Sequence, residues 1–166
     1  MLAERLADGM RRAWDATKRE PLTSEMTGWT VESVALPAAK DLDKEQMESQ
    51  LKAHDARFLA MGGASRLAWL RRCEAGHRID VTCLRLGRAR ILHLPGELFV
   101  EYQLAAKKER PDLFVAMAAY GDYAPWYIGT AVAYEQGGYE TTPPASNVSP
   151  GAEAELLRAI HKLLQD

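Results

Sequence analysis

The sequence predicts a layered α/β fold in which helices flank a mixed sheet. Short runs that alternate apolar and polar residues occur at 28–36, 79–86 and 89–94, and such alternation is typical of strands. Longer segments with apolar residues at helical spacing lie around these runs. The order strand, strand, helix, strand, helix in the second half of the chain indicates a layered α/β domain.

The first half of the chain predicts helices around a single strand. Residues 2–19 are expected to form an amphipathic helix that ends before Pro21, because apolar residues recur there at helical spacing: Leu2, Leu6, Met10 and Trp14. The strand 28–36 follows and ends at Pro37. Residues 43–60 favour a second helix that Gly62 and Gly63 break, and another helix begins near Leu67 and ends near Gly76.

The middle of the chain predicts a hairpin, a helix and a buried strand. Residues 79–86 and 89–94 flank Gly87-Arg88, which is typical of a tight turn. A helix is expected over 97–109, where Pro111 stops it. The wholly apolar run 113–119 predicts a strand buried on both faces.

The C-terminal region predicts two more helices. A short helix is expected over 130–136, ahead of Gly137-Gly138. The last helix carries an apolar stripe, and Ser149 is expected to cap it with Pro150 at its first position.

Composition excludes several classes of protein. The chain has 166 residues, 47% of them apolar and 27% charged, as expected for a soluble globular domain or part of one. A net charge of -2 with scattered basic residues gives no electrostatic basis for nucleic-acid binding. No apolar run is long enough to span a membrane. No secretory signal is visible, which favours the cytoplasm, or a secreted or periplasmic location if a signal lies upstream.

The cysteines and histidines form no metal-binding motif. Cys73 and Cys83 lack the CxxC spacing, and Cys83 is expected to be a small core residue of its strand. The chain has neither HxH nor HExxH. Three histidines are expected at the surface (His54, His77 and His161), whereas His93 is expected in the core or behind a site.

Two features after the hairpin could carry chemistry. Glu97 follows an apolar strand and Pro95-Gly96, so it is either a first-turn glutamate favoured by the helix dipole or a carboxylate ligand or general base at a sheet edge. Glu101 is expected four residues later on the same helical face as a possible second carboxylate. Five tyrosines occur between residues 120 and 139; tyrosines most often pack, but a phenol also binds metals or donates to an oxyanion. The spacing does not choose between these roles.

The segment from Leu86 onward resembles the neutral/alkaline non-lysosomal ceramidase family, particularly its divergent bacterial members. Four stretches carry the resemblance: RLGRARILHLPGE, LFVEYQLAAKK, DLFVAMAAYGDY and YIGTAVAYEQGGYE. The family implies a zinc-dependent amide hydrolase of lipid metabolism that cleaves N-acylsphingosine into fatty acid and sphingoid base. The resemblance further implies that Glu97 and Tyr127 are metal ligands, as zinc carboxylate and zinc phenolate. It implies that Tyr139 is a catalytic residue that contacts the substrate near the scissile amide.

The resemblance also implies that residues 1–166 form a single partial domain of a larger catalytic domain. Residues 1–78 would be a variable helical and linker region, and 79–166 the strand–helix–strand core that carries the site. The family's histidine ligands lie upstream of this region, whereas catalytic zinc needs about three protein ligands. The expected partners are therefore a small-molecule amide or lipid substrate and the missing N-terminal part of the same domain, and the isolated chain is expected to be inactive. The alternative is a non-catalytic α/β interaction module or a degenerate paralogue.

Overall fold

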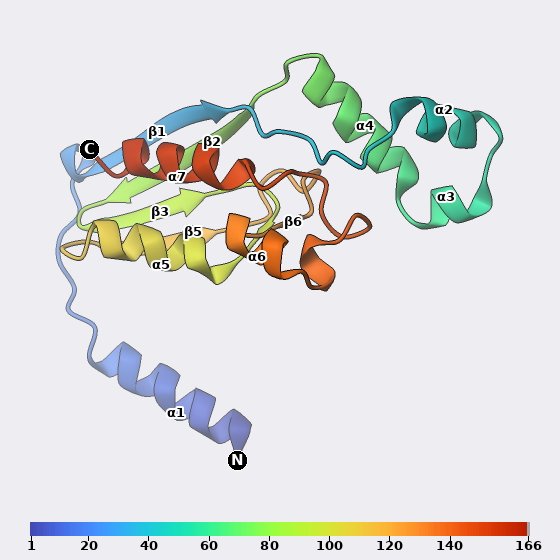
Figure 1. Ribbon diagram of the computed structural model, residues 1–166. Helices are drawn as coiled ribbons and strands as arrows, with labels where there is room; N and C mark the ends of the chain where they lie inside the picture. Colours follow the sequence, from blue (N-terminus) through green and yellow to red (C-terminus); the bar gives the residue numbers. More distant parts are fainter. Residues whose placement is uncertain (166) are drawn as a thin grey trace.

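The computed structural model describes residues 1–165 and shows a mixed α/β architecture, which confirms the predicted fold class (Figure 1). The described helices are α1 (Leu2–Asp15), α2 (Lys44–Lys52), α3 (Ala56–Ala60), α4 (Gly63–Glu74), α5 (Val100–Glu109), α6 (Ala131–Gln136) and α7 (Ala152–Leu163). The described strands are β1 (Thr27–Val34), β2 (Ile79–Leu86), β3 (Ala89–His93), β4 (Glu97–Leu98), β5 (Phe114–Ala118) and β6 (Tyr127–Ile128).

The main sheet has four strands in the order β1-β2-β3-β5. The β1–β2 and β2–β3 pairs are antiparallel, and the latter is the hairpin that the sequence predicts. β5 returns parallel to β3 after the crossover through β4 and α5. A second, two-stranded sheet pairs β4 with β6 in parallel.

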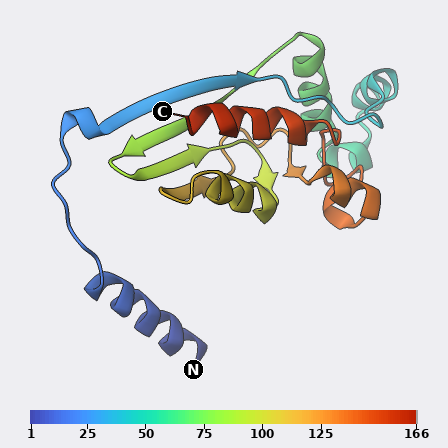
Figure 2. The same cartoon turned by 60° about the vertical axis from the view of Figure 1, so that its left-hand side comes forward.

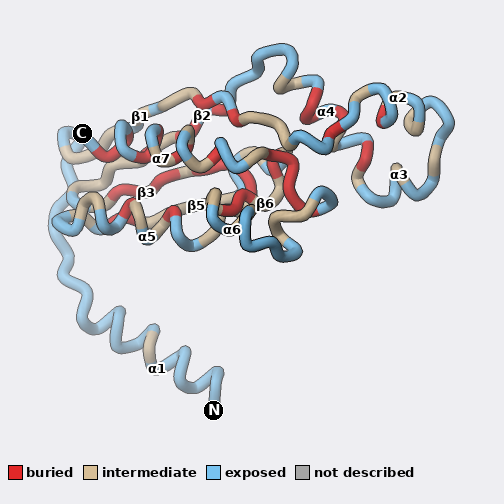
Figure 3. The backbone as a smooth tube through the Cα atoms, viewed as in Figure 1, coloured by how far each residue is buried: buried red, intermediate tan, exposed pale blue. Residues whose placement is uncertain are grey.

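The core lies on one face of the main sheet. Val34, Val81 and Leu92 point to this face and are completely buried. α7 covers it with Leu156 and Ile160, which are also buried. α5 and α7 contact each other, and both contact the main sheet. They therefore lie on the same face of the sheet, the face that holds the core (Figures 1 and 3).

Helices α2 to α4 form a separate lobe beside the sheet (Figure 1). The buried Trp69 of α4 donates a hydrogen bond from Nε1 to the carbonyl oxygen of Asn147 at 2.8 Å. This bond ties the lobe to the loop before α7. α1 stands clear of the rest of the chain and has no buried residue (Figures 1 and 2).

Four of the predicted helices differ in the structure. The helix predicted over 2–19 ends at Asp15, and the helix predicted to begin near Leu67 begins at Gly63. The helix predicted over 97–109 begins only at Val100, because Glu97 and Leu98 pair with β6 as strand β4. The helix predicted over 43–60 is broken in two, because the Asp55 side chain caps α3 by accepting from the Phe58 N–H at 3.0 Å. All four predictions were wrong at these positions.

Two further predictions are corrected by burial and capping. The strand predicted to be buried on both faces is the edge strand β5, where Phe114 is 70% exposed and Val115 is buried. Its apolar composition did not reveal its edge position. The predicted side-chain cap by Ser149 is absent: α7 starts at Ala152, whose N–H bonds to the Ser149 carbonyl oxygen at 3.0 Å.

Other residue-level predictions are confirmed. Cys83 is 1% exposed in the core, and both cysteines are free thiols. The three histidines expected at the surface are exposed: His54, His77 and His161. Within the part of the chain that is described, no helix has the length and apolar character needed to cross a bilayer.

Candidate functional site

The turn between β3 and β4 positions Glu97. Gly96 has a φ of 63°, and a Cβ added there would lie 2.6 Å from the carbonyl oxygen of Trp126. Only glycine fits such a close approach of two backbone segments. The approach allows the Glu97 N–H to bond to the Trp126 carbonyl oxygen at 2.8 Å and sets Glu97 beside Tyr127 in the β4–β6 pair.

The loop after β5 is held against this turn. The Tyr120 N–H bonds to the Gly96 carbonyl oxygen at 2.8 Å, and the Gly121 N–H bonds to that of Leu94 at 3.0 Å. Tyr120 and Trp126 adopt φ values of 67° and 57°, which are uncommon for residues other than glycine. Such backbone strain persists where the surrounding contacts fix it and is concentrated at functional sites.

These backbone contacts place three tyrosines beside one carboxylate, and a fourth, Tyr139, lies against one of the three. We call this group the Glu97–tyrosine cluster: Glu97, Tyr120, Tyr123, Tyr127 and Tyr139. The Tyr123 hydroxyl donates to Oε2 of Glu97 at 3.3 Å. The rings of Tyr120 and Tyr123 stack with centroids 5.8 Å apart. The rings of Tyr127 and Tyr139 meet edge to face at 6.2 Å.

The Glu97 carboxylate governs the electrostatics of the cluster. Its negative charge is the main cause that raises the pKa of Tyr127. Hydrogen bonding to Glu97 is the main cause that raises the pKa of Tyr120, whereas desolvation comes first for the raised pKa of Tyr123, followed by the charge of Glu97. All three phenols therefore stay protonated at neutral pH and act as hydrogen-bond donors.

The structure brings together the three residues that the sequence singles out. Glu97 and Tyr127 are paired neighbours, and Tyr139 lies against Tyr127. The sequence did not predict the contact of Tyr123 with Glu97. The feature that could have indicated it is the high number of tyrosines between residues 120 and 139. Glu97 is not a first-turn helical glutamate, and it shares no helical face with Glu101, because it lies in a strand.

Tyr134 takes no part in the cluster. Its hydroxyl hydrogen-bonds with Oγ of Ser146 at 2.7 Å, and burial is the main cause that raises its pKa. This tyrosine fixes the loop that precedes α7.

The residues present do not fit a catalytic zinc site by themselves. No group of three or more His, Cys, Asp or Glu side chains placed to hold a metal occurs among residues 1–165. The cluster offers one carboxylate, and its other donors are phenols. Since catalytic zinc needs about three protein ligands, the predicted ligands Glu97 and Tyr127 form at most part of such a site.

His93 does not complete the set of ligands. Its ring packs 5.2 Å from that of Trp29. Its Nδ1 is buried without a hydrogen-bond partner within the described residues. His93 lies in β3 and is half-buried outside the core, so the structure does not confirm the prediction of a core histidine.

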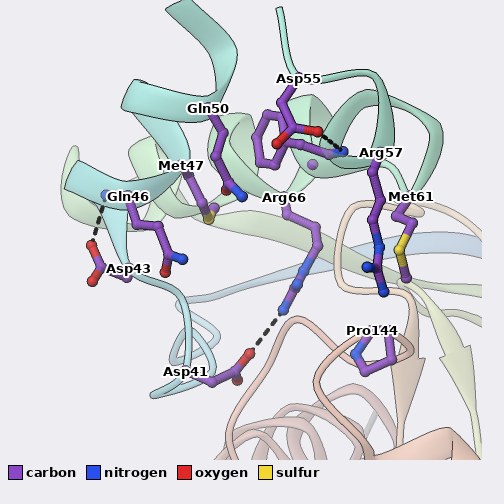
Figure 4. A pocket seen from close by; sticks show the side chains of 12 residues that line it. Asp41, Asp43, Gln46, Met47, Gln50, Asp55, Arg57, Met61, Arg66 and Pro144 are labelled. Atoms are coloured by element: carbon purple, nitrogen blue, oxygen red, sulfur yellow. Dashed lines mark hydrogen bonds and ion pairs between the residues drawn. The ribbon is translucent and has the colours of Figure 1, made fainter. Parts of the chain in front are cut away.

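A separate cavity of about 240 Å³ lies among α2, α3, α4 and Pro144 (Figure 4). Its acidic side chains hold the lobe together. Asp43 and Asp55 accept hydrogen bonds from the first turns of α2 and α3, and Asp41 pairs with Arg66 at 2.9 Å. The Glu97–tyrosine cluster therefore remains the candidate site.

The comparisons with known proteins give a partial likeness. No family model matches the sequence, and the search of curated proteins found no match. A solved structure, the neutral ceramidase from Pseudomonas aeruginosa, is similar to part of the chain with a TM-score of 0.43 and 18% sequence identity. The match covers 51% of this chain and 14% of that protein. A likeness with so low a TM-score assigns no role to any individual residue of this chain.

Proposed function

We propose that this chain supplies the carboxylate and tyrosine side of an amide hydrolase site of ceramidase type. The observation that carries the proposal is the convergence of Glu97, Tyr127 and Tyr139 in one cluster. Helix α5 and strand β5 separate Glu97 from Tyr127 in the sequence, and helix α6 separates Tyr127 from Tyr139. The ceramidase resemblance selects them from the sequence alone, and their proximity is what a shared site requires.

The chemistry of the cluster suits an amide substrate. Amide hydrolysis develops negative charge on the carbonyl oxygen, which fixed hydrogen-bond donors stabilise. The protonated phenol of Tyr127 is such a donor, because the nearby Glu97 raises its pKa. The Glu97 carboxylate accepts a proton or a hydrogen bond from the attacking water or the amide N–H. Tyr139, 67% exposed, leaves a ring available to the substrate.

The proposal assigns no step to zinc, because this chain's donors are too few. Histidine ligands for a zinc ion would have to come from residues outside this sequence. We therefore expect no amide hydrolysis by the isolated chain. A non-catalytic α/β module is the second candidate, favoured by the lack of a three-ligand group among the described residues.

The test compares two glutamates in the protein as its own cells produce it. N-acylsphingosine hydrolysis is measured for the natural protein, Glu97→Ala and Glu101→Ala. Glu101 is an exposed carboxylate on α5 and serves as the matched control. We expect the rate to fall by at least about 100-fold for Glu97→Ala and to stay unchanged for Glu101→Ala. An unchanged rate for Glu97→Ala would support the non-catalytic module instead.

A further inference from the structure

Helix α1 presents an apolar stripe that no other part of its own chain covers. Its members recur at helical spacing and have exposed fractions between 66% and 82%: Leu2, Leu6, Met10 and Trp14. Figures 1 and 2 show the helix well apart from the rest of the chain, and its surface is exposed almost throughout in Figure 3. An isolated helix of 14 residues is only marginally stable in water, and amphipathic helices gain stability by packing this stripe.

The main sheet presents a second uncovered apolar surface, which we call the open face. The strand register places one row of side chains there, Trp29, Leu84, Ile91 and Ala116, and a second row, Val31, Thr82, His93 and Ala118. Both α5 and α7 lie on the opposite face. Trp29 and Val31 on the edge strand β1 are 56% and 48% exposed, and Phe114 on the opposite edge strand β5 is 70% exposed. A contiguous exposed apolar surface of this kind marks an interaction site.

We infer that α1 of one copy of this chain packs on the open face of a second copy, and that the two copies exchange their helices reciprocally. A twofold axis makes the two helix–sheet contacts equivalent, so one arrangement covers both apolar surfaces of both chains. This inference uses parts of the molecule that the proposed function does not use, because the Glu97–tyrosine cluster contributes no residue to either surface.

The connection between α1 and β1 favours a second copy as the occupant. Leu22 lies against the β2–β3 turn at Gly87, and the Gly87 N–H bonds to the Met26 carbonyl oxygen at 2.8 Å. Pro21 fixes its own φ at about −65°, and Glu20 before it is biased to extended backbone. The segment 16–21 therefore leads α1 away from its own sheet, and it spans up to about 20 Å toward a neighbour.

The two surfaces match in length and area. A helix of 14 residues is about 21 Å long, and β1 with 8 residues is about 27 Å long. Aromatic side chains bury about 150–250 Å² each, so the exposed parts of Trp14, Trp29 and Phe114 offer roughly 400 Å² per copy. With a similar amount from the aliphatic side chains, two contacts approach the about 1,600 Å² of a standard protein interface.

Light scattering on the purified chain over a range of concentrations tests the inference. We expect a species of twice the 18.5 kDa of the single chain. The double variant Leu6→Glu/Met10→Glu places charges on the α1 stripe, and Val31→Glu places one on the open face; all three positions are exposed, so folding is not at risk. Each variant should be monomeric. Arg5→Glu changes the charge of α1 at a polar position and should leave the dimer intact.

Mixing the two variants separates exchange from other arrangements. In a mixture, the intact helix of the Val31→Glu chain can pack on the intact open face of the Leu6→Glu/Met10→Glu chain. One of the two contacts is thereby restored, so heterodimers should form, at higher concentrations than the dimer of the unchanged chain. A monomer whose Trp14 fluorescence shows burial would mean that α1 closes on its own sheet and would overturn the inference. So would a dimer that both variants retain, or a monomer that binds phosphatidylcholine vesicles through α1.

Discussion

The substitution Gly96→Ala tests how the β3–β4 turn builds the site. Gly96 has a φ of 63°, and the added Cβ would lie 2.6 Å from the Trp126 carbonyl oxygen. That oxygen accepts the Glu97 N–H bond, and its displacement would disturb the pairing of Glu97 with Tyr127. The variant should therefore lose stability and the geometry of the cluster together.

Gly76 provides the matched control for the magnitude. It also has a positive φ, 73°, but nothing lies within 4 Å of a Cβ added there. Gly76→Ala should cost only the left-handed backbone penalty of about 1–2 kcal/mol. Gly96→Ala adds the steric conflict with a backbone atom, for which overpacking costs of about 1–3 kcal/mol are typical. The expected loss for Gly96→Ala is thus about 2–5 kcal/mol.

Urea denaturation followed by circular dichroism measures both free energies of unfolding. We expect Gly96→Ala to be less stable than Gly76→Ala by at least about 1 kcal/mol. Equal losses in the two variants, within about 0.5 kcal/mol, would refute the argument that the close approach of Gly96 to Trp126 holds β4 against β6.

Three further predictions concern a helix cap, a buried hydroxyl and the phenols of the cluster. Asp43→Ala removes the side-chain cap of α2 and should lower the free energy of unfolding by about 1 kcal/mol in urea denaturation. Tyr102→Phe removes a buried hydroxyl that donates to the Gly129 carbonyl oxygen at 3.0 Å, and the unpaired acceptor should cost about 1–3 kcal/mol in the same assay. Glu97 raises the pKa of Tyr127 in the native state. The protonated phenol of Tyr127 therefore stabilises the fold in full below the unfolded tyrosine pKa of about 10. This stabilisation is lost as the pH rises through the native pKa of Tyr127. Glu97→Gln should lower that native pKa in an ultraviolet titration of phenolate absorbance; an unchanged titration would show that the carboxylate is not close to the phenol.

Local patterns predicted the hairpin and the core positions well. The β2–β3 hairpin follows from alternation and a turn dipeptide within one short stretch, and β2 has the predicted bounds 79–86. Cys83 was placed in the core by the same alternation. Such features depend on neighbouring residues, which a sequence displays directly.

Long-range pairing limited the rest of the prediction. Glu97 favours a helix by its position before α5, but its backbone bonds to Trp126, which is distant in the sequence. The apolar run around Phe114 is typical of a central strand, whereas the order of the strands places it at an edge of the sheet. The residues of the candidate site were selected by a family resemblance rather than by spacing, and Tyr123 was not selected because no local pattern distinguishes it from the other tyrosines.

The most direct test of the Glu97–tyrosine cluster is nuclear magnetic resonance of the purified chain with labelled tyrosine rings, titrated with a hydrolysis-resistant N-acyl amide. We predict shifts for the rings of Tyr123, Tyr127 and Tyr139 that weaken in Glu97→Gln, with no shift for the buried ring of Tyr102. A ligand that leaves the cluster rings unchanged at saturating concentration would contradict its assignment as the amide site.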